Sequence, residues 1–139
     1  MDNPSENQRT ILIVDDDDTV RNFVSRTLGV EGGYNLLVAS SGEEALEKAG
    51  NFDGTIHLLL SNVQMPGMTG LDLSAKLSLA RPDLKVILMS GFEQGLLVLN
   101  EGWHFIHKPF VPSSLRSIVA TVFSQPDVPN LDERRPKSK

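Results

Sequence analysis

The sequence predicts an α/β fold, a doubly wound five-stranded parallel sheet with helices between the strands. Two observations support this prediction. Five short apolar runs recur along the chain, and helical periodicity fills the gaps between them. The first four runs are almost continuous, which is typical of strands buried on both faces of a parallel sheet. The predicted strands are Ile11–Val14, Leu36–Ala39, Ile56–Leu60, Val86–Met89 and Trp103–Ile106.

The fifth run alternates more with polar residues, so we expect it at an edge of the sheet. The helices are predicted by apolar spacing and by caps. Residues 20–28 place apolar side chains at i, i+3, i+4 and i+8, which gives one buried face. Ser41, with Glu44 three residues later, is a capping-box start. Further helices are predicted at Leu71–Ala80, at Glu93–Asn100, where the pattern is short and weak, and at residues 115–123.

Length and composition indicate one domain. The chain has 139 residues, a net charge of −5 and no cysteine. We assign residues 10–124 to the domain, 1–9 to a polar extension, and 125–139, rich in proline and charge, to a disordered tail or linker. The absence of cysteine excludes disulfide scaffolds, zinc fingers and cysteine nucleophiles. No apolar run could span a membrane, no signal peptide is apparent, and the acidic balance argues against nucleic-acid binding. We expect a cytoplasmic protein.

Polar groups follow the predicted strands at their carboxyl ends, where open α/β sheets bind ligands. Four carboxylates, Asp15 to Asp18, come after the first strand. Asp15 and Asp16 are the hard oxygen ligands that Mg²⁺ prefers, and this interpretation is favoured for them. Asp17 and Asp18 stand at a helix start, where an anion is favourable with the helix dipole; for Asp18 that simpler interpretation is favoured.

The other strand ends add different chemistry. Residues 61–70 after the third strand contain a Pro-Gly turn, Ser90 ends the fourth strand, and Lys108 follows the fifth. Each alone is an ordinary loop residue, and a lone lysine is usually a solvated surface charge. Together at one sheet edge, carboxylates, a hydroxyl and an ammonium suit a phosphoryl group, whose oxygens Mg²⁺ and the lysine would neutralise.

These residues resemble the receiver domain of two-component response regulators. The segments ILIVDD at 11–16, LLLSNVQMPGMTG at 58–70, ILMSG at 87–91 and HKPF at 107–110 occur in the order of that family. The resemblance covers residues 10–124, and its details are similar to receivers attached to hybrid histidine kinases. It implies a flavodoxin-like (βα)5 fold of receiver type. It also implies a histidine kinase or another signalling protein as partner.

The resemblance implies a role for each residue. Asp15 and Asp16 match the acidic pair that binds Mg²⁺, in a site completed at Asn62 and Gln64. Ser90 matches the switch hydroxyl and Phe105 the switch aromatic. Lys108 matches the lysine that pairs with the phosphoryl group, and Pro109 the cis-proline after it. In the family, a kinase passes phosphate from a histidine to an aspartate after the third strand.

That aspartate is missing, because Asn62 stands at its position. A neutral amide is no nucleophile and cannot form an acyl phosphate. Ser61 is adjacent, but strand alternation points it away. The chain is therefore either a natural degenerate receiver that works by protein contacts or a receiver carrying an Asp→Asn change. In both cases we expect no catalysis, and Mg²⁺ binding weakened by Asn62.

Two further departures concern assembly and capping. Lys108 follows Ser90 by only 18 positions, which leaves little room for the fourth helix. Dimerisation through that helix is therefore in doubt, and we expect at most a weak homodimer. Val111 stands before Pro112, where a Thr or Ser cap would be expected.

Two other function classes compete with the receiver. ILIVDDDDTV at 11–20 also fits the first motif of haloacid-dehalogenase-like phosphatases, with Asp15 as nucleophile and Asp17 as general acid. That interpretation leaves MPGMTG unexplained and lacks a final acidic pair. The chain could also be a pure interaction module. A metal site at His57, His104 and His107 is disfavoured by their spacing, and core packing is the simpler interpretation of His57.

Overall fold

The computed structural model describes residues 8–91 and 102–125. They form one parallel sheet, and its strand order β2-β1-β3-β4-β5 is that of the predicted doubly wound fold. Because β1, β3 and β4 are parallel neighbours, their carboxyl ends lie side by side. The strands are β1 (Thr10–Val14), β2 (Asn35–Ala39), β3 (Leu58–Asn62), β4 (Lys85–Ser90) and β5 (Trp103–His107).

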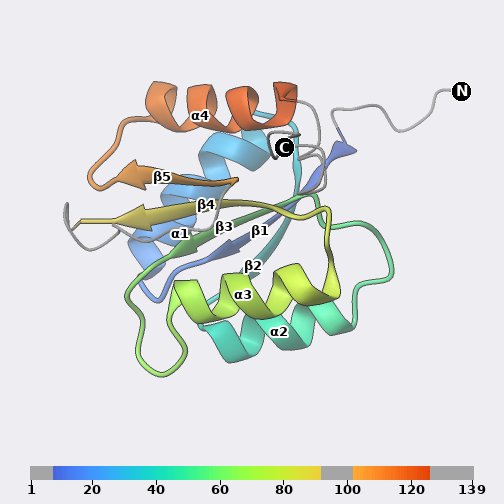
Figure 1. Ribbon diagram of the computed structural model, residues 1–139. Coiled ribbons are helices and arrows are strands. Elements are labelled where there is room, and N and C mark those ends of the chain that lie inside the picture. The colour runs from blue at the N-terminus through green and yellow to red at the C-terminus, as the bar shows by residue number, and fades with distance from the viewer. Residues whose placement is uncertain (1–7, 92–101, 126–139) are drawn as a thin grey trace, which may run out of the picture.

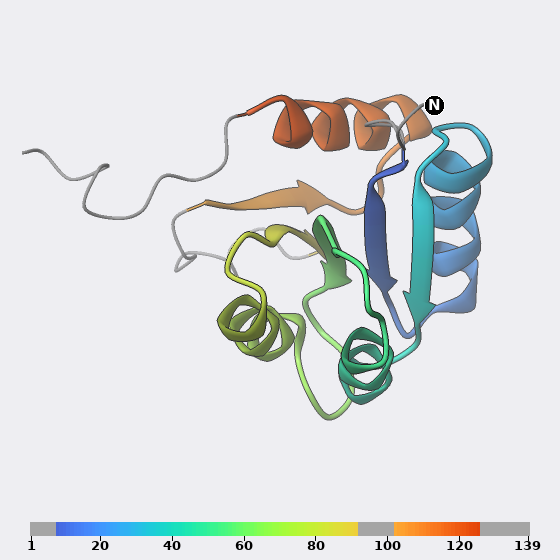
Figure 2. The ribbon, with the colours of Figure 1, turned by 90° about the vertical axis from the view of Figure 1, so that its right-hand side faces the viewer.

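Helices cover both faces of the sheet (Figures 1 and 2). One face packs against α1 (Asp18–Ser25), the π-helical turn η2 (Arg26–Val30) and α4 (Pro112–Ser124). The other packs against α2 (Gly42–Gly50) and α3 (Gly70–Ala80). Alternate residues of the central strands enter the two cores, so Ile11 and Ile13 face α1 and α4 while Leu12 and Val14 face α2 and α3. The near-continuous apolar runs follow from this two-sided burial.

The third strand differs from the prediction. The apolar run predicted Ile56–Leu60, whereas β3 spans Leu58–Asn62. Ile56 is buried without belonging to the ladder, and Ser61 belongs to it although it is polar, because its backbone pairs with β1 and β4. Side-chain polarity reports burial, whereas a strand's limits depend on backbone pairing. The shift matters, because Asn62 is the last residue of the strand and its position is fixed by the sheet.

The helix starts have a clear basis in the sequence. The hydroxyl of Ser41 accepts from the Glu44 N–H at 3.0 Å, as the capping box predicts. The Glu44 carboxylate reaches back to the N–H of Ser40 rather than of Ser41, at 2.7 Å. This bond, followed by one from the Ser40 hydroxyl, holds the pKa of Glu44 below its usual value. At α4, Val111 makes no side-chain cap and Pro112 begins the helix.

The first helix changes form at its end. The apolar spacing predicted one helical face over residues 20–28, but the α-helix stops at Ser25 and continues as the π-turn η2. There the N–H of Glu31 donates to the carbonyl of Arg26. A β-carbon on Gly29 would lie 2.7 Å from Leu36 of β2, so glycine allows this turn to pack closely on the edge strand.

Several predictions fall elsewhere in the chain. Residues 1–7 of the polar extension, the weak helix Glu93–Asn100 and most of the tail, 126–139, lie outside the described residues.

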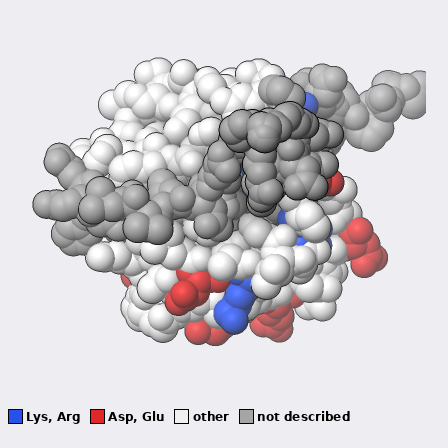
Figure 3. All heavy atoms as spheres, viewed as in Figure 1, with Lys and Arg blue, Asp and Glu red and all other residues white. Residues whose placement is uncertain are grey.

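No helix in 8–91 or 102–125 is long and apolar enough to cross a membrane. On the face shown in Figure 3, the visible basic side chains are interspersed with acidic ones.

His57 lies at the opposite end of the sheet from the strand ends that carry the candidate site. It precedes β3. Its ring Nδ1 accepts the backbone N–H of Thr10 at 3.0 Å, and the backbone N–H of His57 donates to the Thr10 carbonyl at 2.9 Å. The imidazole therefore helps to close the start of β1. Burial, and then the positive charge of Arg9, lowers the pKa of His57. Burial and Lys85 likewise lower the pKa of His104.

The unfolding free energy should therefore fall as the pH falls from about 7 to about 5. An unfolded histidine titrates near pH 6.5, whereas the folded protein disfavours the proton, so the unfolded state binds more protons just below that pH. The slope is at most about 1.4 kcal/mol per pH unit for each histidine. Urea denaturation at several pH values measures it. His57→Asn keeps an acceptor for Thr10 but does not titrate, so its slope should be shallower; an unchanged slope would contradict this assignment.

Gly70 gives a second stability prediction. A β-carbon there would lie 2.1 Å from the carbonyl oxygen of Asn62, whereas one on Gly50 would meet nothing within 4 Å. Gly70→Ala should cost roughly 2–3 kcal/mol of unfolding free energy, because backbone must move to admit the methyl group. The matched control Gly50→Ala should be neutral or stabilising by up to about 1 kcal/mol. Equal effects in thermal denaturation would show that the close approach is not a constraint.

Candidate functional site

A crevice of about 310 Å³ opens at the carboxyl ends of the strands, on the side where the arrowheads point in Figure 1. It brings together residues from four segments that the sequence analysis selected separately. Its lining consists of Asp15, Asp16, Asp17, Asn62, Gln64, Ser90, Gly91 and Lys108. Ser61 is fully buried, and its hydroxyl donates to the Asn62 carbonyl at 3.0 Å, so it is absent from this lining.

Asp15 is the buried anchor of the crevice, with no exposed surface. One carboxylate oxygen accepts the N–H of Asp17 at 2.9 Å, and the other pairs with the Lys108 ammonium at 2.9 Å. Lys108 retains 23% of its side-chain exposure. A buried carboxylate needs such a partner, because an isolated charge is costly to remove from water. The pair joins the end of β1 to the loop after β5.

Asn62 lies between the two charged groups. Its Oδ1 accepts from the Lys108 ammonium at 3.2 Å. Its Nδ2 donates to the Asp16 carboxylate at 3.2 Å and to the Gln64 carbonyl at 2.8 Å. The amide orientation is fixed by its neighbours, since an ammonium can only donate and carboxylate and carbonyl oxygens can only accept.

The two remaining carboxylates, Asp17 and Asp18, both make contacts at the start of α1. Asp17 caps α1, accepting the N–H of Thr19 at 2.8 Å, although it also lines the crevice. Asp18 is exposed and pairs with Arg21 in the first turns of α1. The simpler interpretation that the sequence favoured for Asp18 agrees with this geometry. Only Asp15 and Asp16 remain free of the cap and close to Asn62.

Of the three other predicted site residues, only Ser90 lines the crevice; Phe105 and Pro109 do not. Ser90 ends β4 in the crevice wall and is almost fully buried. Phe105 is half-buried on β5, where its ring packs edge-on to His107 at 4.6 Å, and it does not line the crevice. The Lys108-Pro109 peptide bond is cis. Its proline faces a separate groove beside the crevice.

Arg21 is a functional candidate that the sequence analysis did not single out. Its guanidinium donates to the Asp15 carbonyl at 2.7 Å and pairs with Asp18. It therefore fixes the backbone that presents the acidic pair. The spacing of Asp18 and Arg21, three residues apart at a helix start, was a weak signal for this contact. The carbonyl bond has no sequence signature.

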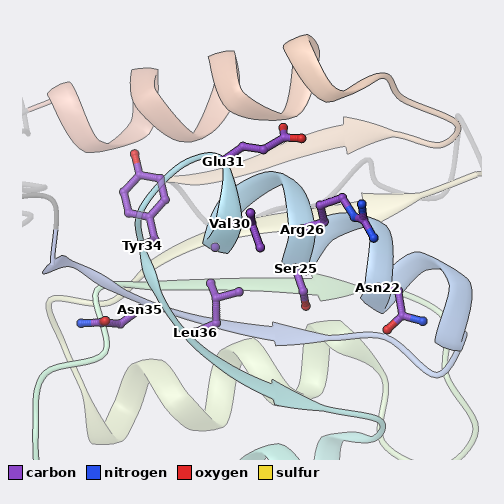
Figure 4. Close-up of a pocket in the computed structure, with 9 residues that line it drawn as sticks. Asn22, Ser25, Arg26, Val30, Glu31, Tyr34, Asn35 and Leu36 are labelled. Carbon is purple, nitrogen blue, oxygen red and sulfur yellow. The ribbon is translucent and has the colours of Figure 1, made fainter.

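Two other hollows lie near α1. An apolar groove of about 480 Å³ borders the crevice through Lys108, and Thr19, Val20, Phe23, Pro109 and Phe110 form the rest of its lining. The rings of Phe23 and Phe110 lie 5.8 Å apart. A larger, mixed hollow of about 880 Å³ lies between η2 and β2 and includes Arg26, Glu31, Tyr34 and Leu36 (Figure 4). It contains none of the predicted site residues.

The crevice offers the oxygen ligands that a hard cation such as Mg²⁺ prefers, but Asn62 leaves it one carboxylate short. Mg²⁺ binds oxygen ligands, and the crevice offers four groups of this kind: the carboxylates of Asp15 and Asp16, the Gln64 carbonyl and the amide oxygen of Asn62. Among the described residues, however, no three Asp, Glu, His or Cys side chains are grouped so that they could hold a metal ion. A third carboxylate would stand at position 62, where this chain has an asparagine.

Comparison with known proteins identifies the family. The family model described as "Response regulator receiver domain" matches residues 11–120. The chain belongs to the response regulator receiver domains. A crystal structure of the receiver domain from the hybrid histidine kinase CckA has 36% identity and a TM-score of 0.72, covering 83% of this chain and 99% of that one. The predicted resemblance and fold are therefore confirmed.

The chain spans only 12% and 39% of the lengths of two curated relatives that it matches. Sensor kinase CckA of Brucella abortus is 36% identical over 117 residues, which cover 81% of this chain but only 12% of that kinase. Response regulator GacA of Pseudomonas viridiflava is 38% identical over 85 residues, covering 60% of this chain and 39% of GacA. The structure of TrrA from Thermotoga maritima, solved with Mg²⁺-BeF, has 29% identity and a TM-score of 0.72, covering 83% of this chain and 99% of that one.

The Asp15–Lys108 pair gives a third prediction. Lys108→Met should lower the unfolding free energy by about 3 kcal/mol, because it leaves a fully buried carboxylate without its cation. The control is Arg116→Met, which breaks the Arg116–Glu31 pair, whose side chains are 45% and 47% exposed. That change should cost under about 1 kcal/mol. Urea denaturation of both variants compares them, and equal losses would show that Asp15 does not depend on Lys108.

Proposed function

We propose that this receiver domain works in a two-component phosphorelay without accepting phosphate itself, and that it signals through protein contacts. The position of Asn62 carries the proposal. It ends the central strand β3, within hydrogen-bonding distance of Lys108 and Asp16, where the family places its phosphoacceptor aspartate. The amide has no anionic oxygen with which to attack a phosphoryl group.

The groups around Asn62 support the rest of the assignment. Lys108 and Ser90 stand where they would contact a phosphoryl group, and Phe105 is the candidate switch aromatic on β5. Asp15, Asp16 and the Gln64 carbonyl would hold Mg²⁺, which would shield phosphoryl oxygens. TrrA, a relative of the same fold, was crystallised with Mg²⁺-BeF. For this chain we propose weak Mg²⁺ binding, because the third carboxylate is missing.

The groove next to the crevice is the surface we propose for partner contact. Val20, Phe23 and Phe110 expose apolar surface directly beside Lys108. A histidine kinase or another signalling protein that docked there would lie against the phosphoryl crevice. The relatives CckA and GacA are named as a sensor kinase and a response regulator, which agrees with such partners. We place the domain in the cytoplasm, without catalytic turnover, and propose at most a weak homodimer.

The phosphatase alternative has no comparable support. Asp15, its nucleophile, is fully buried and paired with Lys108, and Asp17, its general acid, caps α1. The family match accounts for residues 11–120 without it. The other alternative, a pure interaction module, agrees with the proposal, because in both cases the domain acts through protein contacts and takes no phosphate.

A phosphorylation assay tests the proposed function. The parent chain should take no phosphate from acetyl phosphate, whereas Asn62→Asp should gain one phosphoryl group, because it places a carboxylate between Lys108 and the acidic pair. Intact-mass spectrometry should show a single added phosphoryl mass that is labile to base. The gain should require Mg²⁺.

The controls separate the acceptor from its surroundings. Asn62→Asp combined with Asp15→Asn should lose the gain, because the buried anchor and metal ligand is removed. Asn22→Asp, at an exposed position on α1, should stay unmodified. Phosphate on the parent chain, at any aspartate, would overturn the assignment of Asn62 as the vacant acceptor position.

A further inference from the structure

We infer that the Asn62 amide replaces the divalent cation of the crevice, so that Mg²⁺ must displace this side chain in order to bind. The inference deepens the proposed function and rests on it. It starts from the two hydrogen bonds of Nδ2, which reach Asp16 at 3.2 Å and the Gln64 carbonyl at 2.8 Å. These are two of the oxygens assigned above to the metal.

The side-chain oxygens of Asp15 and Asn62 also have partners within the protein. The two oxygens of Asp15 accept from the Asp17 N–H and from Lys108, and Oδ1 of Asn62 accepts from Lys108. The partly positive NH₂ group therefore gathers the Asp16 and Gln64 oxygens, as a cation would, while the amide oxygen faces the lysine. The side chain is a dipole whose two ends match the charges on either side.

An aspartate at this position could not make the same contacts. Its second oxygen would face the Asp16 carboxylate and the Gln64 carbonyl at the distances that Nδ2 now occupies, so acceptor would meet acceptor. Three carboxylates would then face the single ammonium of Lys108, and a cation would be needed to hold them together. Asparagine removes that need, because it carries its own donor.

The alternative is that Asn62 is simply a poor ligand, whose amide oxygen still helps to bind the metal. The two explanations differ for Asn62→Ala. If Asn62 is a ligand, alanine weakens Mg²⁺ binding further. If the amide competes, alanine frees the Asp16 and Gln64 oxygens and binding does not weaken. Asn62→Asp cannot separate the explanations, because the added carboxylate strengthens binding in both.

The experiment is a titration of the whole chain with MgCl₂ alone, without phosphate or partner, by isothermal calorimetry. Asn62→Ala should bind Mg²⁺ with a Kd equal to or lower than that of the parent, and Asn62→Asp at least tenfold more tightly than the parent. The matched control Asn22→Ala should leave the Kd unchanged. A Kd for Asn62→Ala above that of the parent would overturn the inference.

A second measurement uses the parent chain, in case the alanine variant does not fold. The Asn62 NH₂ proton signals, assigned by their loss in Asn62→Asp, should exchange slowly with water in the metal-free protein. Saturating Mg²⁺ should speed their exchange, because the amide leaves its acceptors. Signals that stay equally protected at saturation would contradict displacement. Neither measurement involves phosphate, so phosphate found on the parent chain would overturn the proposed function without deciding whether Mg²⁺ displaces the Asn62 amide.

Discussion

The ion pair between Asp15 and Lys108 is the interaction on which the crevice depends. It joins residues 93 positions apart in the chain, one at the end of β1 and the other after β5. Asp15 is fully buried, and its two carboxylate oxygens find their partners in Lys108 and the Asp17 N–H. β3 and β4 lie between β1 and β5 in the sheet, and their ends carry Asn62 and Ser90. The pair therefore links the two sides of the crevice, across the strand ends that carry Asn62 and Ser90.

The parallel topology explains why these groups meet at all. Every strand of the sheet runs in the same direction, so residues that follow strands far apart in the chain share one edge. The same topology requires buried strands, which is why apolar runs predicted the sheet so well. The shared carboxyl edge of parallel strands predicted that Asp15, Asp16, Ser90 and Lys108 lie together, and the receiver resemblance added Asn62 and Gln64. All six line one crevice.

Details that depend on backbone geometry could not be predicted in this way. The limits of β3 were wrong by two residues, because Ile56 is buried outside the ladder and polar Ser61 lies within it. The π-turn after Ser25 has the apolar spacing of an ordinary helix end, and the close approach of Gly29 to Leu36 of β2 has no local pattern in the sequence. The bond from Arg21 to the Asp15 carbonyl is likewise a tertiary contact with no local pattern. Phe105 was assigned by resemblance alone, and its ring packs beside His107 rather than in the crevice.

Asn62 shows how one atom can change the kind of site that the same fold presents. The backbone holds the residue in place, since Asn62 pairs with Met89 of β4, Ser61 before it pairs with both β1 and β4, and the carbonyl of Asn62 lies against Gly70. The side chain therefore cannot move away from Lys108 and Asp16 without breaking hydrogen bonds. With a carboxylate, this fixed position concentrates negative charge and calls for a cation. With an amide, the same position balances the charges internally. On our proposal, a receiver built in this way keeps its partner-facing groove beside Lys108 in one arrangement, because neither metal nor phosphate is needed to hold the crevice together.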